Sequence, residues 1–246
     1  MRIFKLFLTA VMTFAVASSN AQTTVVKSFD KVIVSPYIQV TFVQGNQESV
    51  AINDIHVDAS KLHIEVTGQT LRLYLTGAKD IPKYEKHYSN GYMDNHSLYQ
   101  NTSVVATITY KTLSTLSVRG EETQLCESPI TGNDFKLRIY GESNVIINEM
   151  NLQRLETTMY GEGTLEIRSG SVKEQKYLCY GEGKINCAAI TGSTSHITAY
   201  GEADFNLNVS DKIKVTAFGD ARLHYHGNPE IVKGLHFGDM LIDKKD

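Results

Sequence analysis

An aromatic residue, a glycine and a carboxylate recur as a unit along the C-terminal half of the chain. The copies read IYGES, MYGEG, CYGEG, AYGEA and AFGDA, beginning at Ile139, Met159, Cys179, Ala199 and Ala217. The carboxylates directly after the glycines are Glu142, Glu162, Glu182, Glu202 and Asp220, with Glu121 and Asp239 in equivalent places at the two ends. Carboxylates can bind cations, accept hydrogen bonds or work as acid and base, so their arrangement decides the chemistry.

The spacing of the units predicts that they form rows. The glycines are Gly120, Gly141, Gly161, Gly181, Gly201, Gly219 and Gly238, with steps of 21, 20, 20, 20, 18 and 19 residues. A period near twenty is typical of stacked coils, which place equivalent residues about 4.8 Å apart. One row would hold the aromatic residues Tyr140, Tyr160, Tyr180, Tyr200, Phe218 and Phe237.

Adjacent carboxylates in the other row would repel each other by roughly 1 kcal/mol in a water-like dielectric. We expect them to fan into solvent; the alternative is that Ca²⁺ bridges neighbours.

The regularity of the carboxylates argues against catalysis. A catalytic pair needs two carboxyl groups in unlike environments, so that their pKa values separate. These carboxylates look alike, and we predict no catalytic residue among them. His56, His63, His196, His224, His226 and His236 share no spacing. His87 and His96 lie in one polar segment and could share a metal, although nothing in the sequence fixes their geometry.

Alternating apolar columns predict the elements that carry the rows. Four residues after successive glycines stand Val145, Leu165, Ile185, Phe205 and Leu223, and two residues before them stand Ile139, Met159, Cys179, Ala199 and Ala217. Alternation is the periodicity of a half-buried strand. Each unit is therefore a strand, a glycine corner and a second strand, closed by a second turn such as TGST at 191–194. The fold class predicted is all-β, a right-handed parallel β-helix-like solenoid of two-stranded coils.

The chain divides into three predicted parts. Residues 1–21 have early cations, an apolar run and small residues before Gln22, which is typical of a secretory signal peptide. Residues 22–110 are expected to form irregular N-terminal β coils, with a polar excursion at 78–102. Residues 111–246 are expected to form the regular solenoid. The protein should be exported, to the periplasm, the outer surface or the medium, without a membrane span in the mature chain.

The composition of the chain limits the classes of partner that it is expected to bind and the state of its cysteines. The formal net charge is -3 and no cluster of lysine and arginine exists, so binding to nucleic acid is not expected. Three cysteines, Cys126, Cys179 and Cys187, cannot all pair within one chain. Because Cys126 and Cys187 fall in an apolar column, we interpret the cysteines as buried free thiols, with a Cys179–Cys187 disulfide as the alternative.

The aromatic row allows two interpretations. Stacked rings stabilise a fold by roughly 0.5 to 1.5 kcal/mol per pair and need no ligand. Exposed rings beside carboxylates could instead form a platform for a glycan or a surface protein. The candidate platform residues are Tyr140, Tyr160, Tyr180, Tyr200, Phe218, Glu142, Glu162, Glu182, Glu202 and Asp220.

The export signal, the glycine corners and the closing HYHGNPEI at 224–231 together resemble the putative auto-transporter adhesins with a head GIN domain, a family of exported Gram-negative proteins. The resemblance runs from about Ser28 to Leu241 and implies a β-solenoid and a role in cell adhesion. The family corner usually reads Gly-Ser-Gly; here glutamate replaces the serine, and the second glycine remains only at Gly163 and Gly183.

The sequence is compatible with three functions. The leading hypothesis is a non-enzymatic adhesion or binding module that contacts a glycan or a cell-surface protein, with homo-oligomers possible. The second is a polysaccharide lyase or hydrolase on a similar scaffold. The third is a purely structural envelope protein.

Overall fold

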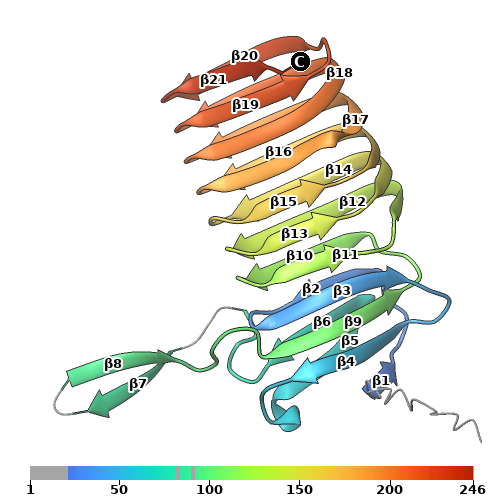
Figure 1. Cartoon of the computed structure of the whole chain (residues 1–246), viewed down its shortest axis with the longest axis vertical. Helices are drawn as coiled ribbons and strands as arrows, with labels where there is room; N and C mark the ends of the chain where they lie inside the picture. The colour runs from blue at the N-terminus through green and yellow to red at the C-terminus, as the bar shows by residue number, and fades with distance from the viewer. Residues whose placement is uncertain (1–21, 81–83, 90–91, 246) are drawn as a thin grey trace, which may run out of the picture.

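The structure is a computed structural model that describes residues 22–80, 84–89 and 92–245. The expected signal peptide at 1–21 lies outside the described residues. The chain forms an all-β solenoid in which two-stranded coils stack along one long axis (Figure 1). The predicted fold class is confirmed in its β-solenoid architecture.

The strands of the N-terminal part are β1 (Gln22–Val25), β2 (Lys31–Val34), β3 (Ile38–Gln44), β4 (Ser49–Ile55), β5 (Leu62–Thr67), β6 (Thr70–Leu75), β7 (Tyr84–Ser89), β8 (Tyr92–Ser97) and β9 (Val104–Tyr110). A short 3₁₀ turn, η1 (Ala59–Lys61), joins β4 to β5. The regular part contains β10 (Thr115–Gly120), β11 (Thr123–Cys126), β12 (Ile130–Gly141), β13 (Asn144–Ile147), β14 (Met150–Tyr160), β15 (Thr164–Ile167), β16 (Gly170–Tyr180), β17 (Gly183–Tyr200), β18 (Ala203–Phe218), β19 (Ala221–His226), β20 (Glu230–Phe237) and β21 (Met240–Lys244).

Neighbouring coils of the regular part pair in parallel and in register. Tyr140 pairs with Tyr160 between β12 and β14, and Tyr160 pairs with Tyr180 between β14 and β16. The apolar columns predicted from the sequence are buried, including Val145, Leu165, Ile185, Phe205 and Leu223. Burial of these alternating columns between the two strands of each coil supplies the hydrophobic free energy that holds the stack together.

The glycine corners have two steric requirements. Gly181 has φ +111°, a conformation that L residues rarely adopt, and a Cβ there would lie 2.6 Å from the Gly161 carbonyl oxygen. Two residues further on, a Cβ at Gly163 would lie 2.8 Å from Cγ2 of Ile139, and one at Gly183 would lie 2.7 Å from Sδ of Met159. The second glycine is therefore kept where the buried neighbour is large. The equivalent positions Ser143, Ala203 and Ala221 carry a Cβ and are buried.

The three cysteines are free and buried, as we expected. Burial raises the pKa of each thiol, Cys126, Cys179 and Cys187, to about 12. They act as small apolar side chains of the core.

The strands of the N-terminal part do not stack in chain order. The coil of β2 and β3 lies between the coil of β6 and β9 on one side and that of β10 and β11 on the other. Beyond β6 and β9, strands β5, β4 and β1 pair in antiparallel fashion and cover this end of the stack. Periodicity identified these segments as strands, but it carries no information on partner or direction.

The polar excursion forms a separate antiparallel hairpin of β7 and β8. It leaves the corner between β6 and β9 and projects from the same side of the molecule as the glycine corners (Figure 1). In its backbone register His87 stands opposite Asp94 and His96 opposite Glu85, so the two histidines are not paired with each other.

The C-terminal end of the stack is built differently from the other end. Among the described residues, β20 pairs only with β18, and β21 only with β19. The register of β20 shifts between Lys233 and His236, and Lys233 stands opposite the buried Val215. A register shift and an exposed lysine on the last strand are devices that discourage another strand from pairing with an edge.

Candidate functional site

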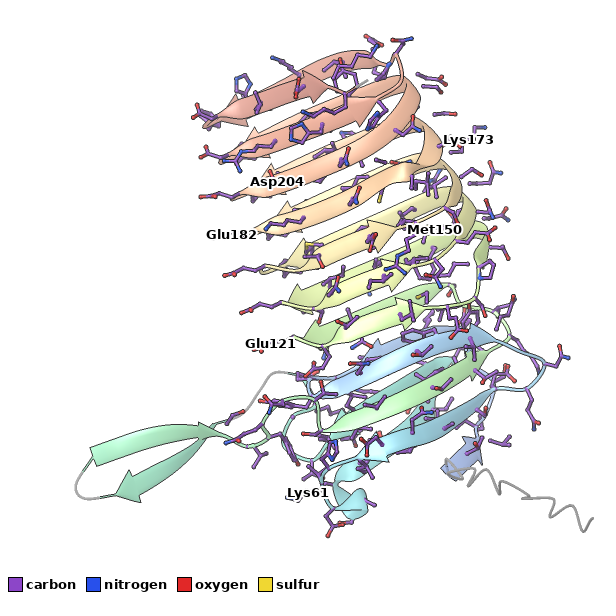
Figure 2. The ribbon with its side chains drawn as sticks, in the orientation of Figure 1. Lys61, Glu121, Met150, Lys173, Glu182 and Asp204 are labelled. Atoms are coloured by element: carbon purple, nitrogen blue, oxygen red, sulfur yellow. The ribbon has the colours of Figure 1, made fainter. Side chains whose placement is uncertain are left out.

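The glycine corners of the regular coils lie above one another along one long side of the solenoid. We call this side the corner edge and define it by residues 119–121, 140–142, 160–162, 180–182, 200–202, 218–220 and 237–239. Figure 2 labels Glu121 and Glu182 on this side, while Lys173 lies on the opposite side. The backbone ties the corners together, since the Glu182 amide donates to the Gly161 carbonyl oxygen at 3.0 Å. The corner edge is therefore a rigid, repeating surface.

The aromatic residues of the corner edge form one continuous stack. Ring centroids are 5.2 Å apart for Tyr140 and Tyr160, 4.8 Å for Tyr160 and Tyr180, and 4.9 Å for Tyr180 and Tyr200. The planes of these pairs differ by 3–6°. Phe218 continues the stack at 4.9 Å from Tyr200, and Phe237 follows at 5.8 Å with a 25° tilt. The spacing equals the distance between paired strands, so strand pairing imposes it.

The stacking decides which parts of the rings a partner can reach. Each inner ring has a neighbour on both faces, so its faces are covered and its outer edge remains accessible. Tyr160 is 40% exposed and Tyr200 is 39% exposed. Phe237, the last ring, is 62% exposed. A sugar could therefore lie flat on a ring only at Phe237, whereas the tyrosines offer ring edges and hydroxyl groups.

The N-terminal end of the aromatic stack is covered by a cation. The Arg119 guanidinium lies over the Tyr140 ring, 5.4 Å from its centroid. Arg119 also donates to Asp80, which accepts a second hydrogen bond from Arg72 at 2.5 Å. The hydrogen bond from Arg72, with that from Arg119, lowers the pKa of Asp80. Asp80 belongs to the root of the polar excursion, so this cluster anchors the excursion to the head of the stack. A small hollow of about 160 Å³ lies beside it.

The carboxylates form the second row of the corner edge. Glu121, Glu142, Glu162, Glu182, Glu202, Asp220 and Asp239 are all exposed. Within residues 22–80, 84–89 and 92–245, none of them forms an ion pair with a lysine, arginine or histidine. The Asp220 Oδ1 also accepts a hydrogen bond from the Asp239 amide at 3.0 Å.

Other charged columns of the same solenoid alternate in sign. On the outer face of one sheet, Arg154 lies between Asp134 at 3.8 Å and Glu174 at 3.0 Å. On the other sheet, Arg222 pairs with Asp204 at 3.7 Å. Charges across paired strands normally compensate each other, and like charges directly opposite destabilise a sheet. The row of carboxylates is the exception among these columns.

Across the described part of the chain, no three His, Cys, Asp or Glu residues converge to hold a metal ion. Glu122, next to the row, is buried behind the first corner, and burial raises the pKa of its carboxyl group against the backbone hydrogen bonds that lower it. Its Oε2 accepts from the Glu121 amide at 3.1 Å, which explains its place in the corner.

All ten predicted platform residues lie together on the corner edge. Sequence reasoning missed the cation at its head, because Arg119 belongs to a coil without the aromatic residue and Asp80 comes from the excursion. It also treated the turns on the opposite side as closing elements alone.

The fold and the corner edge define a parallel β-solenoid with one like-charged, aromatic side. The chain belongs to the family described as putative auto-transporter adhesin, head GIN domain, whose model matches residues 28–229. The resemblance stated from the sequence is confirmed. The adhesin family indicates an exported or surface protein.

Solved structures share the fold. A putative adhesin from Bacteroides fragilis NCTC 9343 has 20% identity and a TM-score of 0.74, covering 92% of this chain and 96% of its own. A putative adhesin from Parabacteroides merdae ATCC 43184 has 16% identity and a TM-score of 0.66, with the same coverage of 92% and 96%. A putative lipid binding protein from Parabacteroides distasonis ATCC 8503 has 18% identity and a TM-score of 0.63, covering 93% and 98%. At these identities the likeness concerns the fold. No curated protein matches the sequence.

Within the described residues, the structure contains no helix with the length and apolar character needed to cross a membrane.

Proposed function

We propose that the protein is an exported, non-enzymatic adhesion or binding module that holds a surface partner along its corner edge. Membership in the adhesin family supports a binding role. The observation that carries the choice of surface is the row of seven unpaired carboxylates, Glu121, Glu142, Glu162, Glu182, Glu202, Asp220 and Asp239.

The like-charged row works against stability. Each carboxylate lies about one strand spacing from the next and repels it. Elsewhere the solenoid places compensating charges in such columns, as at Asp134, Arg154 and Glu174. Places where a sequence departs from its own stabilising pattern are expected at functional sites. A partner that brings positive charge would remove the repulsion on binding.

The chemistry of the edge selects the partner. The ring faces are covered by one another, so stacking of sugars offers little contact area except at Phe237. Carboxylates and tyrosine hydroxyls accept hydrogen bonds from ammonium and guanidinium groups, and exposed ring edges pack on the aliphatic parts of lysine and arginine. The partner that fits best is an extended, cationic segment of a cell-surface protein.

The test compares binding to arrays of cationic peptides and to arrays of glycans, using the chain from Gln22 onward. The proposal expects peptide binding that weakens as salt rises, because exposed charges are screened. The double variant Glu162→Gln, Glu182→Gln should weaken it, as should Tyr160→Ala, Tyr180→Ala. Glu166→Gln, a carboxylate that pairs with Arg168 on a sheet face, is the matched control.

The alternatives give different results. Retention of glycans that depends on Tyr160 and Tyr180 would replace the cationic partner by a sugar. Release of fragments from acidic polysaccharides would replace the binding module by an enzyme. Absence of peptide binding, of glycan binding and of polysaccharide cleavage would favour a structural envelope protein.

A further inference from the structure

The side of the solenoid opposite the corner edge contains a groove that the proposed function does not use. A hollow of about 570 Å³ lies there, across the second turns of five successive coils. Its lining includes Gln153, Lys173, Thr191, Ser193 and Asn208. We call it the turn groove. Lys173, labelled in Figure 2, marks its side of the molecule.

The groove arises from a change in coil length. The step from Gly201 to Gly219 is 18 residues instead of 20. The missing residues fall at the second turn: Cys187 pairs with Leu207, twenty residues on, whereas Thr194 pairs with Lys212, eighteen residues on. The longer turns, such as 188–194, therefore project beyond the shorter turn at 208–212. A step of this kind leaves a shelf in an otherwise even side.

The floor of the groove includes bare backbone. A Cβ at Gly192 would lie 2.3 Å from Nε2 of Gln175, and one at Gly227 would lie 2.2 Å from the Val209 carbonyl oxygen. Glycine is therefore required at both places by the neighbouring atoms, and these two lining positions present no side chain to the groove.

The lining combines apolar residues, Leu152 and Val209, with polar side chains that have unused hydrogen-bonding groups. In the part of the chain that the structure describes, the side chains of Gln153, Thr191, Ser193 and Asn208 have no hydrogen-bond partner. Hydroxyl and amide groups both donate and accept, as do the hydroxyl groups of sugars. The volume falls within the range of about 300 to 1,000 Å³ that holds small ligands.

Lys173 adds one positive charge. Among the described lining residues it alone is charged, and within the described chain it forms no ion pair. On the opposite side of the molecule the corners present the row of carboxylates, with the cation of Arg119 at the head of the aromatic stack. An anionic ligand would thus be repelled by one side and attracted by the other.

We propose that the turn groove binds an acidic oligosaccharide, with the sugar hydroxyls held by Thr191, Ser193 and Asn208 and a carboxylate held by Lys173. The inference is independent of the cationic partner proposed for the corner edge. A neutral sugar would lack the ion pair, and an acidic peptide would lack the hydroxyl groups that match the lining.

Calorimetric titration tests the inference with an oligogalacturonate, its methyl ester of the same length and an acidic peptide as probes. The acid should bind, and the ester should bind more weakly. Lys173→Glu should reduce the affinity for the acid by about fivefold, since exposed ion pairs are individually weak. Lys184→Glu makes the same charge change at an exposed site near the corner edge and should leave the affinity unchanged.

A second variant guards against a purely electrostatic effect. Thr191→Trp, at an exposed position, should fill the hollow and abolish binding while the thermal midpoint stays near that of the parent chain. Equal affinity for acid and ester, preference for the peptide, unchanged binding in both Lys173→Glu and Thr191→Trp, or absence of binding would each overturn the proposal.

Discussion

The rings of Tyr160 and Tyr180 lie 4.8 Å apart at their centroids, with planes only 3° from parallel. Parallel strand pairing of β14 and β16 places the two residues directly opposite each other, so the backbone register sets the ring geometry. The aromatic stack is therefore part of the fold before it is part of any binding surface.

The stack should contribute measurably to stability. Tyr180→Leu removes two ring contacts, and each such pair contributes about 0.5 to 1.5 kcal/mol. We expect a lower free energy of unfolding in denaturant titrations, whereas Tyr180→Phe keeps both contacts and should match the parent. Equal losses in the two variants would assign the effect to the hydroxyl group.

The glycine corner should tolerate no side chain at its first position. Gly181→Ala places a Cβ 2.6 Å from the Gly161 carbonyl oxygen at φ +111°, and we expect a loss of about 3 kcal/mol or failure to fold. Gly68 also has a positive φ, +59°, but the Cβ that Gly68→Ala adds would have no atom within 4 Å. Its loss should be about 1 to 2 kcal/mol. Thermal denaturation of both variants measures the difference, and similar losses would contradict the steric explanation.

The carboxylate row should oppose folding through repulsion. Glu182→Gln should raise the thermal midpoint at low ionic strength, and added salt should shrink the difference. Asp204→Asn removes a carboxylate that is paired with Arg222 and should not raise the midpoint. A salt-independent gain at Glu182 would show that repulsion is not its source.

The thiols should be inert in the folded protein. Burial raises the pKa of Cys126, Cys179 and Cys187 to about 12 from 9.0, so thiolate is scarce at pH 8 and labelling should require unfolding. A pKa raised by folding favours the protonated form. The thiol contribution to stability is thus complete below pH 9 and is lost as the pH rises toward 12. Rapid labelling at pH 8 without denaturant would contradict this.

The last coil should protect the stack against self-association. Lys233→Val removes the charge from an exposed position of the edge strand β20, opposite the buried Val215. We expect concentration-dependent oligomers in sedimentation velocity experiments. Lys214→Val, the same change on an exposed sheet face, is the control. A monomeric Lys233→Val variant would assign the protection to the register shift instead.

Much of this architecture is readable from the sequence, for a physical reason. In the regular coils each residue pairs with one about twenty positions away, so period and alternation identify corners, columns and rows such as Tyr160 and Glu162. The N-terminal order could not be read because β2 pairs with both β6 and β10, and no repeat encodes those partners. The sequence did not predict that Arg119 covers the aromatic stack, because this contact depends on an arginine at a position that is aromatic in the other coils. It did not predict the turn groove either, because the groove depends on a turn that is two residues shorter than those before it.

The displaced coil of β2 and β3 has a consequence for the order in which the molecule assembles. Strand β2 can pair at Lys31 only after Thr70 and Thr115 have been synthesised. Each regular coil after β10 and β11 pairs instead with the coil synthesised just before it. Closing longer chain segments costs more entropy and slows folding. In a chain synthesised from its N-terminus, the first segment is therefore the slowest to find its neighbours, and we expect folding to nucleate in the later coils.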